Sequence, residues 1–341
     1  MRSFASDNNS GVHPLVMEAL SRANADHALG YGDDQWTEEA VAKIKETFTP
    51  DCVPLFVFNG TGSNVVALQV MTRPYHSIFC AETAHIYVDE CGSPVKMTGC
   101  QIRPIATADG KLTPELMQPY LHGFGDQHHS QPRALYLSQC TELGTIYTPE
   151  ELKRLTDFAH LNGMYVHMDG ARIANACAAL NLSLKELTVD CGVDILSFGG
   201  TKNGLLFGEA MVIVNPALQA NFRYMIKHNG GMMAKGRLCG VMFLAAMEND
   251  DYFAWARHAN AMADIVRTGM EKGGVPLYQR TTTNQIFAIL TQEQNETLEK
   301  DFSYEIWEKL EDGKVAVRFV TSWATSEEDA HKLADALEAV A

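Results

Sequence analysis

Short apolar runs alternate with amphipathic segments along the first two thirds of the chain. Strands are predicted at residues 55–58, 77–80, 101–105, 134–138, 164–168 and 193–198. Helices are predicted at residues 14–24, 38–48, 64–71, 149–161 and 173–180. Strand–helix–strand units at this spacing predict an α/β fold, with a mostly parallel central sheet that helices cover on both faces. Sites in such folds lie at the carboxyl ends of the strands.

The last third of the chain follows a different pattern. Residues 217–228 and 238–270 are predicted to be mainly helical, and short strands follow at 286–290 and 315–320. A C-terminal helix is expected after a cap at Thr325 or Ser326. We therefore expect residues 1–251 to form an N-terminal segment and a large domain, and residues 252–341 to form a smaller α+β domain.

Composition narrows the class of protein. The 27 Lys and Arg residues against 42 Asp and Glu give a net charge of −15, which repels phosphate backbones and argues against a nucleic-acid partner. No apolar run reaches the ~18 residues of a membrane helix, and the start of the chain lacks a signal-peptide pattern, so we expect a cytoplasmic protein without a membrane partner. The eight cysteines include no C-x-x-C pair, which favours reduced, buried thiols.

A lysine follows the predicted strand at 193–198, in the glycine-rich stretch Gly199-Gly200-Thr201-Lys202. Glycines let the backbone bend sharply and let a ligand approach closely. A lysine amine held among apolar groups loses part of its preference for the charged form, which favours Schiff-base chemistry. The alternative is that Lys202 is a loop lysine facing water.

The run His167-Met168-Asp169-Gly170-Ala171-Arg172 follows the strand predicted at 164–168. A carboxylate at such a strand end can keep a pyridine nitrogen protonated, and Arg172 could contact an oxygen on the same ring. His167 and Asp169 also share one face of the strand, so a metal pair is an alternative. No third residue has metal-ligand spacing and H-E-x-x-H is absent, so a buried histidine beside a helix-capping aspartate is the plainer alternative.

Two more stretches carry candidate chemistry. Asn59-Gly60-Thr61-Gly62 joins a strand to a helix, where backbone N–H groups can hold a phosphate, although a plain tight turn has the same pattern. His85 follows the strand at 77–80, where an imidazole can stack on a flat ring. Pyridoxal 5'-phosphate would use all four stretches, since it needs a lysine, an acid at its ring nitrogen, a stacking group and an anion cradle. The pattern therefore favours this cofactor.

At these residues the sequence resembles the pyridoxal-phosphate-dependent threonine aldolase branch of the β-eliminating lyase family, and most closely its low-specificity members. The resemblance extends over nearly the whole chain and is most specific at residues 58–62, 167–172 and 197–202. It implies the aspartate-aminotransferase-like fold, also called fold type I. It also implies a lyase that cleaves L-threonine, L-allo-threonine and related β-hydroxy-α-amino acids to glycine and an aldehyde.

The resemblance assigns a role to each matching residue. Lys202 matches the Schiff-base lysine, Asp169 the partner of the ring nitrogen, and Arg172 the contact to the ring hydroxyl. The implied cofactor-binding residues are Gly60, Thr61, Gly62, His85, Asp169, Arg172, Thr201, Lys202 and Lys235, with Arg237 as an alternative to Lys235 at the phosphate. The implied substrate-binding residues are Ser6, Tyr31 and Arg318, of which Ser6 and Arg318 hold the carboxylate.

The implied catalytic residues are Lys202, His85 and His128. His128, directly or through water, would remove the proton of the substrate hydroxyl, with the neighbouring His129 as an alternative. A homodimer or homotetramer with shared sites is also implied. Four alternatives stay open: β-elimination or transamination on the same cofactor, a metal-dependent hydrolase, and a non-catalytic phosphate-binding module.

Overall fold

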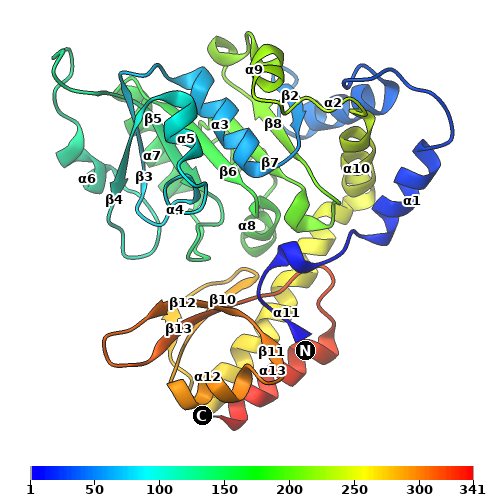
Figure 1. Cartoon of the computed structure of the whole chain (residues 1–341), viewed down its shortest axis with the longest axis vertical. Helices are drawn as coiled ribbons and strands as arrows, with labels where there is room; N and C mark the ends of the chain where they lie inside the picture. Colours follow the sequence, from blue (N-terminus) through cyan, green and yellow to red (C-terminus); the bar gives the residue numbers. More distant parts are fainter. Residues whose placement is uncertain (1, 341) are drawn as a thin grey trace.

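The protein, described here by a computed structural model, consists of two domains joined by one long helix. The structure describes residues 2–340. The larger domain is built on a seven-stranded sheet and the smaller one on a four-stranded sheet. Helix α11 (Asp251–Gly273) extends from one domain into the other, as Figure 1 shows.

The large sheet is mostly parallel, which confirms the predicted fold class. Its strands lie in the order β2 (Val53–Val57), β8 (Glu209–Ile213), β7 (Ile195–Gly199), β6 (Tyr165–Gly170), β5 (Gln131–Ser138), β3 (His76–Ala81) and β4 (Gln101–Ile105). Strand β8 runs antiparallel to both of its neighbours. The connection from Gly199 to Glu209 is too short for a crossover, so the chain reverses there and returns antiparallel.

Helices cover both faces of this sheet, as the sequence pattern predicts. In β5, Leu135 and Leu137 pack into one hydrophobic cluster, whereas Ala134 and Tyr136 pack into a second cluster on the opposite face. The helices of this domain are α1 (Pro14–Ala23), α2 (Gln35–Thr47), α3 (Gly60–Met71), α4 (His85–Val88), α5 (Ser93–Thr98), α6 (Pro114–Met117), α7 (Pro149–Leu161), α8 (Ile173–Leu180), α9 (Phe222–His228) and α10 (Arg237–Met247).

The predicted helical stretch at 238–270 is two helices rather than one. Helix α10 ends at Met247 and α11 begins at Asp251, with a short turn between them. Asn249 and Asp250 in this turn have positive φ angles of 50° and 66°. Asn and Asp tolerate this left-handed conformation better than most residues, so they allow the chain to change direction here.

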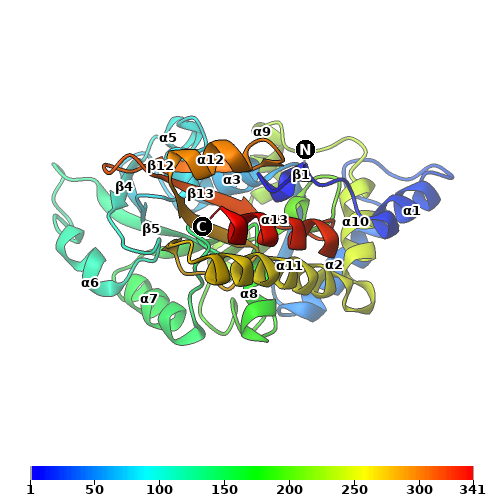
Figure 2. The ribbon, with the colours of Figure 1, turned by 90° about the horizontal axis from the view of Figure 1, so that it is seen from below.

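The small domain contains an antiparallel sheet in the order β12 (Glu305–Lys309), β13 (Val315–Val320), β10 (Gln285–Leu290) and β9 (Leu277–Gln279). Helix α13 (Glu327–Ala339), capped by Ser326, packs along α11, as seen from below in Figure 2. The sequence pattern does not reveal β9, β12 or α12 (Gln292–Leu298), because these elements are short, and β12 and α12 are also largely polar.

Residues from both ends of the chain build the small domain. Strand β1 (Arg2–Ser3) pairs with β11 (Phe302–Ser303), and Phe4 lies in the small domain's hydrophobic core. Helix α11 contributes Trp255 to the large core and Val266 to the small one. We therefore propose to count residues 2–4 with the small domain and to place the domain boundary within α11. Within residues 2–340, no helix combines the length and apolarity needed to cross a membrane.

Candidate active site

Four of the predicted site residues lie at the carboxyl ends of the parallel strands. Asp169 is the second-to-last residue of β6, and Lys202 lies in a short 3₁₀ turn directly after β7. His85 begins α4 after β3, and Gly60 begins α3 after β2. In the α/β architecture this edge of the sheet is where ligands bind.

Asp169 is buried and held by three hydrogen bonds. Its Oδ2 accepts from Asn64 Nδ2 at 3.0 Å and from the Tyr136 hydroxyl at 2.9 Å, and its Oδ1 accepts from the Ala171 N–H at 2.9 Å. Burial alone would raise the pKa of Asp169, but the Asn64 bond and the nearby charges of His85 and Lys202 outweigh it and lower the pKa. The carboxylate is therefore ionised, and Oδ1 keeps one acceptor position for a further donor.

His85 is fixed by a second buried carboxylate. Its Nδ1 lies 2.8 Å from Glu90 Oε1, and the same oxygen accepts a hydrogen bond of 2.8 Å from Asn64 Nδ2. The hydrogen bond to Glu90 raises the pKa of His85. The side-chain amide of Asn64 donates to both Glu90 and Asp169, so it joins these two carboxylates and His85 into one hydrogen-bond network.

His167 lies below this network and is not available as a metal ligand. Its Nε2 lies 2.8 Å from Asn64 Oδ1 and its Nδ1 lies 3.2 Å from the Ile195 carbonyl oxygen, so each ring nitrogen faces a protein oxygen and one of them donates to it. Burial lowers the pKa of His167 to about 4, so the ring is neutral at pH 7. Among the residues the structure describes, no group of three or more His, Cys, Asp or Glu side chains is placed to hold a metal ion.

Lys202 is only partly exposed and is surrounded by charge. Burial, and after it the positive charge of Arg172, lowers the pKa of the Lys202 amine. The carboxylates of Asp7, Asp169 and Glu209 act in the opposite direction. The lowered pKa increases the fraction of neutral, nucleophilic amine at pH 7.

Glu209 supports the turn that carries Lys202. Its Oε2 accepts a hydrogen bond of 2.7 Å from the Gly200 N–H, and burial raises its pKa to about 7. Gly199 lets the end of β7 approach the end of β6, because a Cβ atom there would lie 2.6 Å from the carbonyl oxygens of Gly170 and Ala171. The glycines before Lys202 therefore serve close backbone packing.

The Gly60–Gly62 turn forms the first turn of α3. The side chain of Asn59 caps the helix by accepting a hydrogen bond of 2.8 Å from the Gly62 N–H. Within residues 2–340, the N–H groups of Gly60 and Thr61 have no hydrogen-bond partner. A Cβ atom at Gly60 would meet nothing within 4 Å, so there is open space beside this glycine.

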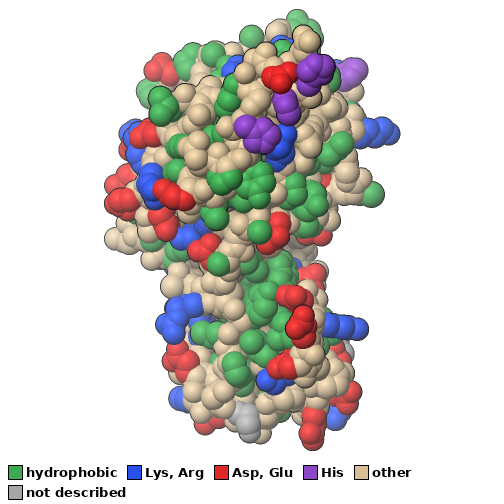
Figure 3. All heavy atoms as spheres, turned by 90° about the vertical axis from the view of Figure 1, so that its left-hand side faces the viewer, with side chains coloured by type: hydrophobic (Ala, Val, Ile, Leu, Met, Phe, Trp, Pro, Cys, Tyr) green, Lys and Arg blue, Asp and Glu red, His purple; other side chains and the backbone are tan. Residues whose placement is uncertain are grey.

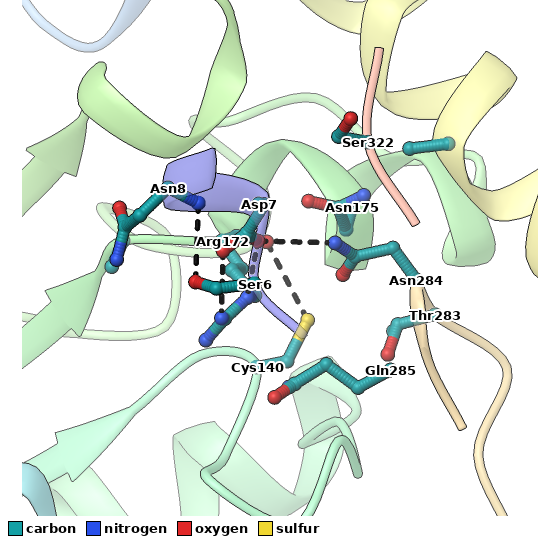
Figure 4. A network of polar contacts seen from close by, with 12 residues as sticks. Ser6, Asp7, Asn8, Cys140, Arg172, Asn175, Thr283, Asn284, Gln285 and Ser322 are labelled. Atoms are coloured by element: carbon teal, nitrogen blue, oxygen red, sulfur yellow. Dashed lines mark hydrogen bonds and ion pairs between the residues drawn. The ribbon is translucent and has the colours of Figure 1, made fainter. Parts of the chain in front are cut away.

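Arg172 is held by the N-terminal segment. Its Nε lies 2.7 Å from Asp7 Oδ2 and its Nη2 lies 2.9 Å from Asp7 Oδ1, a bidentate pair buried between the domains (Figure 4). Ser6 precedes Asp7 and caps its short helix by accepting from the Asn8 N–H. This helix contacts the turn of Lys202, so Ser6 lies next to the site.

Arg318 approaches the site from the small domain. It lies on β13, its guanidinium lies over the Trp307 ring at 5.4 Å, and it forms an ion pair with Glu305 directly opposite on β12. Arg318 Nε is buried without a partner among the described residues. Figure 3 shows the narrow waist between the domains, with hydrophobic side chains exposed at it.

Three predicted residues do not join this cluster within one chain. Tyr31 lines a pocket with residues of α2 and β2, and Lys235 lines a neighbouring hollow with Arg237. His128 lies in the exposed loop before β5, at the amino end of a strand whose carboxyl end faces Asp169. An eight-residue strand separates the two ends by roughly 25 Å, so His128 cannot reach the site of its own chain.

Sequence reasoning missed five residues that shape the site: Asp7, Asn64, Glu90, Tyr136 and Glu209. Two of them carried a usable signal. Glu209 is a lone charge at the start of an otherwise apolar strand, and Asn64 lies two residues after the Gly60–Gly62 turn, just before an apolar run. A charge or amide in such a position is rarely tolerated without a partner.

Comparison with known proteins identifies related sequences over nearly the whole chain. The chain is 38% identical over 335 residues to a low specificity L-threonine aldolase of Pseudomonas aeruginosa, covering 98% of this chain and 96% of the relative. A low specificity L-threonine aldolase of Escherichia coli is 28% identical over 278 residues, covering 78% of this chain and 82% of the relative.

Solved structures give the same result. A threonine aldolase of Leishmania major superposes with a TM-score of 0.96 at 34% identity, covering 100% of both chains. An aspartate aminotransferase of Thermus thermophilus superposes with a TM-score of 0.71 at 14% identity, covering 99% of this chain and 91% of the other, and shares the fold. The family model for beta-eliminating lyases matches residues 3–293. The chain therefore belongs to the beta-eliminating lyase family.

Proposed function

We propose that this protein is a pyridoxal-phosphate-dependent aldolase that cleaves L-threonine, L-allo-threonine and related β-hydroxy-α-amino acids to glycine and an aldehyde. The observation that carries the proposal is the meeting of Lys202, Asp169, His85 and Arg172 at the carboxyl ends of the strands. The relatives that match nearly the full length are L-threonine aldolases, which selects this reaction among those of the fold.

The residues present fit pyridoxal phosphate. The free N–H groups of Gly60 and Thr61, at the positive end of α3, suit its phosphate. The remaining acceptor position on Asp169 Oδ1 suits its pyridine N–H, and the Lys202 amine suits its aldehyde. When bound, the cofactor supplies an electron sink for the charge left at Cα after the Cα–Cβ bond breaks.

The side chains of this chain would then divide the work. Asp169 Oδ1 holds the proton on the ring nitrogen, and its own hydrogen bonds keep it ionised and immobile. Lys202 Nζ, with its lowered pKa, can give up a proton and take it back more readily than an ordinary lysine amine. Arg318 and Ser6 bind the substrate carboxylate and so orient the Cα–Cβ bond.

We also propose that the sites are shared between copies in a homodimer or homotetramer. Tyr31, Lys235 and His128 lie away from Lys202 in their own chain, so they would serve the site of a neighbouring copy. In mixed assemblies, an inactive Lys202→Ala chain and an inactive His128→Phe chain should restore activity, because some sites then contain both native residues. Mixtures that stay inactive would contradict the sharing of sites, and a His128→Phe chain that is active by itself would assign the base role to His129 or to water.

One assay separates the proposed reaction from its alternatives. The purified protein, supplied with pyridoxal phosphate, should convert L-threonine to equimolar glycine and acetaldehyde. Release of a keto acid with amino transfer to the cofactor would show transamination instead, and release of ammonia from serine would show β-elimination. Activity lost to a chelator in a colourless protein would favour a hydrolase, and binding without turnover would favour a phosphate-binding module.

A cytoplasmic location is proposed on the state of the thiols. All eight cysteines are free, and seven of them are buried. Burial raises the pKa of Cys140 to about 12, which keeps this thiol protonated and unreactive. Unpaired cysteines in this number are typical of a reducing compartment.

A further inference from the structure

Asp7 is a buried carboxylate to which the sequence assigns no role. It is 2% exposed, and its two oxygens accept from Arg172 and from Asn284. Burial opposes its ionisation, but the charges of Arg172 and Lys202 outweigh burial and lower its pKa. A buried ion pair contributes little net stability, because the cost of desolvation offsets the attraction. The role of this pair is therefore sought in how it orients Arg172.

The geometry of the pair determines which edge of Arg172 is free. Asp7 occupies the Nε–Nη2 edge of the guanidinium, which leaves Nη1 and the outer N–H of Nη2. The backbone of Arg172 is held as well, because its carbonyl oxygen accepts from Cys140 Sγ at 3.4 Å. The direction in which Arg172 can donate is thus determined by Asp7 and not by packing alone.

A third contact brings in the small domain. Asn284 Nδ2 lies 3.1 Å from Asp7 Oδ2 and also donates to the Thr321 carbonyl oxygen at 2.8 Å. Thr321 follows the end of β13, three residues after Arg318. In Figure 4, Asp7, Arg172 and Asn284 meet from the N-terminal segment, the large domain and the small domain.

We propose that Asp7 is a positioning residue that aims Arg172 at the cofactor and, through Asn284, sets the place of Arg318 relative to it. Asp7 is only 2% exposed and, as a carboxylate, has no donor to offer the substrate, so it acts through these two arginines. The inference rests on the proposed function in one respect, namely that Arg172 contacts the cofactor and Arg318 the substrate.

The test compares Asp7→Asn with Asn284→Ala and with the control Asp190→Asn, which removes an exposed carboxylate paired to Lys185. Cofactor-free proteins are titrated with pyridoxal phosphate, and the loaded enzymes are assayed for KM and kcat with L-threonine. Asp7→Asn should weaken cofactor binding and lower kcat, each by about ten-fold or more, as expected for loss of a charged hydrogen-bond partner. Asn284→Ala should raise KM about three- to ten-fold and leave cofactor affinity unchanged.

The outcomes are distinct. A folded Asp7→Asn protein with wild-type cofactor affinity, KM and kcat but a lower melting temperature would overturn the proposal, since it would make Asp7 purely structural. If Asp7→Asn does not fold, an unchanged KM in Asn284→Ala would do the same. If the wild-type protein does not cleave threonine, the proposed function fails, whereas the cofactor titration still tests the link between Asp7 and Arg172.

Discussion

The two sides of the candidate site are built differently. On the large-domain side, Asp169 and His85 are held by buried hydrogen bonds to Asn64, Tyr136 and Glu90, and each group has a defined partner. On the small-domain side, Arg318 is paired with Glu305, which is 52% exposed, and the Nε atom of Arg318 has no partner within residues 2–340. This difference suits a site that keeps a cofactor through many turnovers but exchanges its substrate in each one. Rigidly held groups preorganise the chemistry, whereas a cation in a partly exposed ion pair can release its partner.

The largest effect is expected at the centre of the rigid side. Lys202→Ala should reduce turnover of L-threonine by about 10⁴-fold or more. Within residues 2–340, no other lysine side chain takes the place of Lys202 to form the proposed covalent link to the cofactor. The visible absorbance of the covalently held cofactor should be lost at the same time. Lys185→Ala, which changes an exposed lysine, serves as the control. Wild-type turnover in Lys202→Ala would contradict the assignment.

Asp169→Asn tests whether the large-domain side of the site needs the negative charge of Asp169 or only the shape of its side chain. The new amide oxygen can still accept from Asn64 and Tyr136, but the NH₂ group faces the Ala171 N–H and cannot accept the ring proton. We expect kcat to fall about 10²–10³-fold, the usual cost of losing one preorganised electrostatic partner. Steady-state kinetics at saturating cofactor measure this, and a fall of less than about three-fold would show that the charge is dispensable.

On the small-domain side, Arg318→Ala should change KM far more than kcat. Under the proposed role of Arg318 at the substrate carboxylate, loss of its guanidinium should raise KM about 10²-fold, while cofactor affinity stays at its wild-type value. Arg257→Ala, which removes an exposed arginine paired to Asp250, is the matched control. If cofactor affinity falls instead, Arg318 belongs to the cofactor side and the comparison of the two sides fails.

The large-domain side of the site can also be tested at Glu209, by measuring thermal stability at two pH values without any assay of activity. Its pKa is raised to about 7 in the folded protein, so the stability it contributes is complete below its ordinary pKa of about 4.5 and is lost as pH rises to 7. Glu209→Gln mimics the protonated form and should melt like the wild type at pH 5. At pH 8 it should be more stable by about 1–3 kcal/mol. Thermal melts of the cofactor-free protein at both pH values check this, and equal melting temperatures at pH 8 would refute it.

The smallest effect is expected at Glu305. If Arg318 binds the substrate carboxylate as proposed, Glu305 competes with the substrate for it, and Glu305→Gln should lower KM about two- to five-fold. Raising the salt concentration should lower the KM of the wild type toward that of the variant. A higher KM in Glu305→Gln would mean that Glu305 orients Arg318 rather than competing for it.

Sequence reasoning located the strand ends but not the contacts beneath them. Lys202 and Asp169 could be predicted because Asp169 directly follows one apolar run and Lys202 lies four residues past another, and the parallel fold brings the ends of such strands together. Asn64, which joins Asp169 to Glu90, could not be assigned a role, since its partners lie 105 and 26 residues away. The role of Asp7 depends on the packing of three chain segments, which no local pattern encodes. His128 was predicted from a sequence motif, yet it precedes β5 and so lies at the amino ends of the strands, opposite the carboxyl ends where the site is.

The pairing of the chain's two ends has a consequence for biosynthesis. Phe4 N–H donates to the Ser303 carbonyl oxygen at 2.7 Å, and the Val320 N–H donates to the Phe4 carbonyl oxygen at 2.7 Å. The segment that pairs through Phe4 is translated before Ser303 and Val320, which follow some 300 residues later. A nascent chain can therefore complete its large sheet while the N-terminal segment still lacks its partners, and this segment can dock only after β13 has been translated.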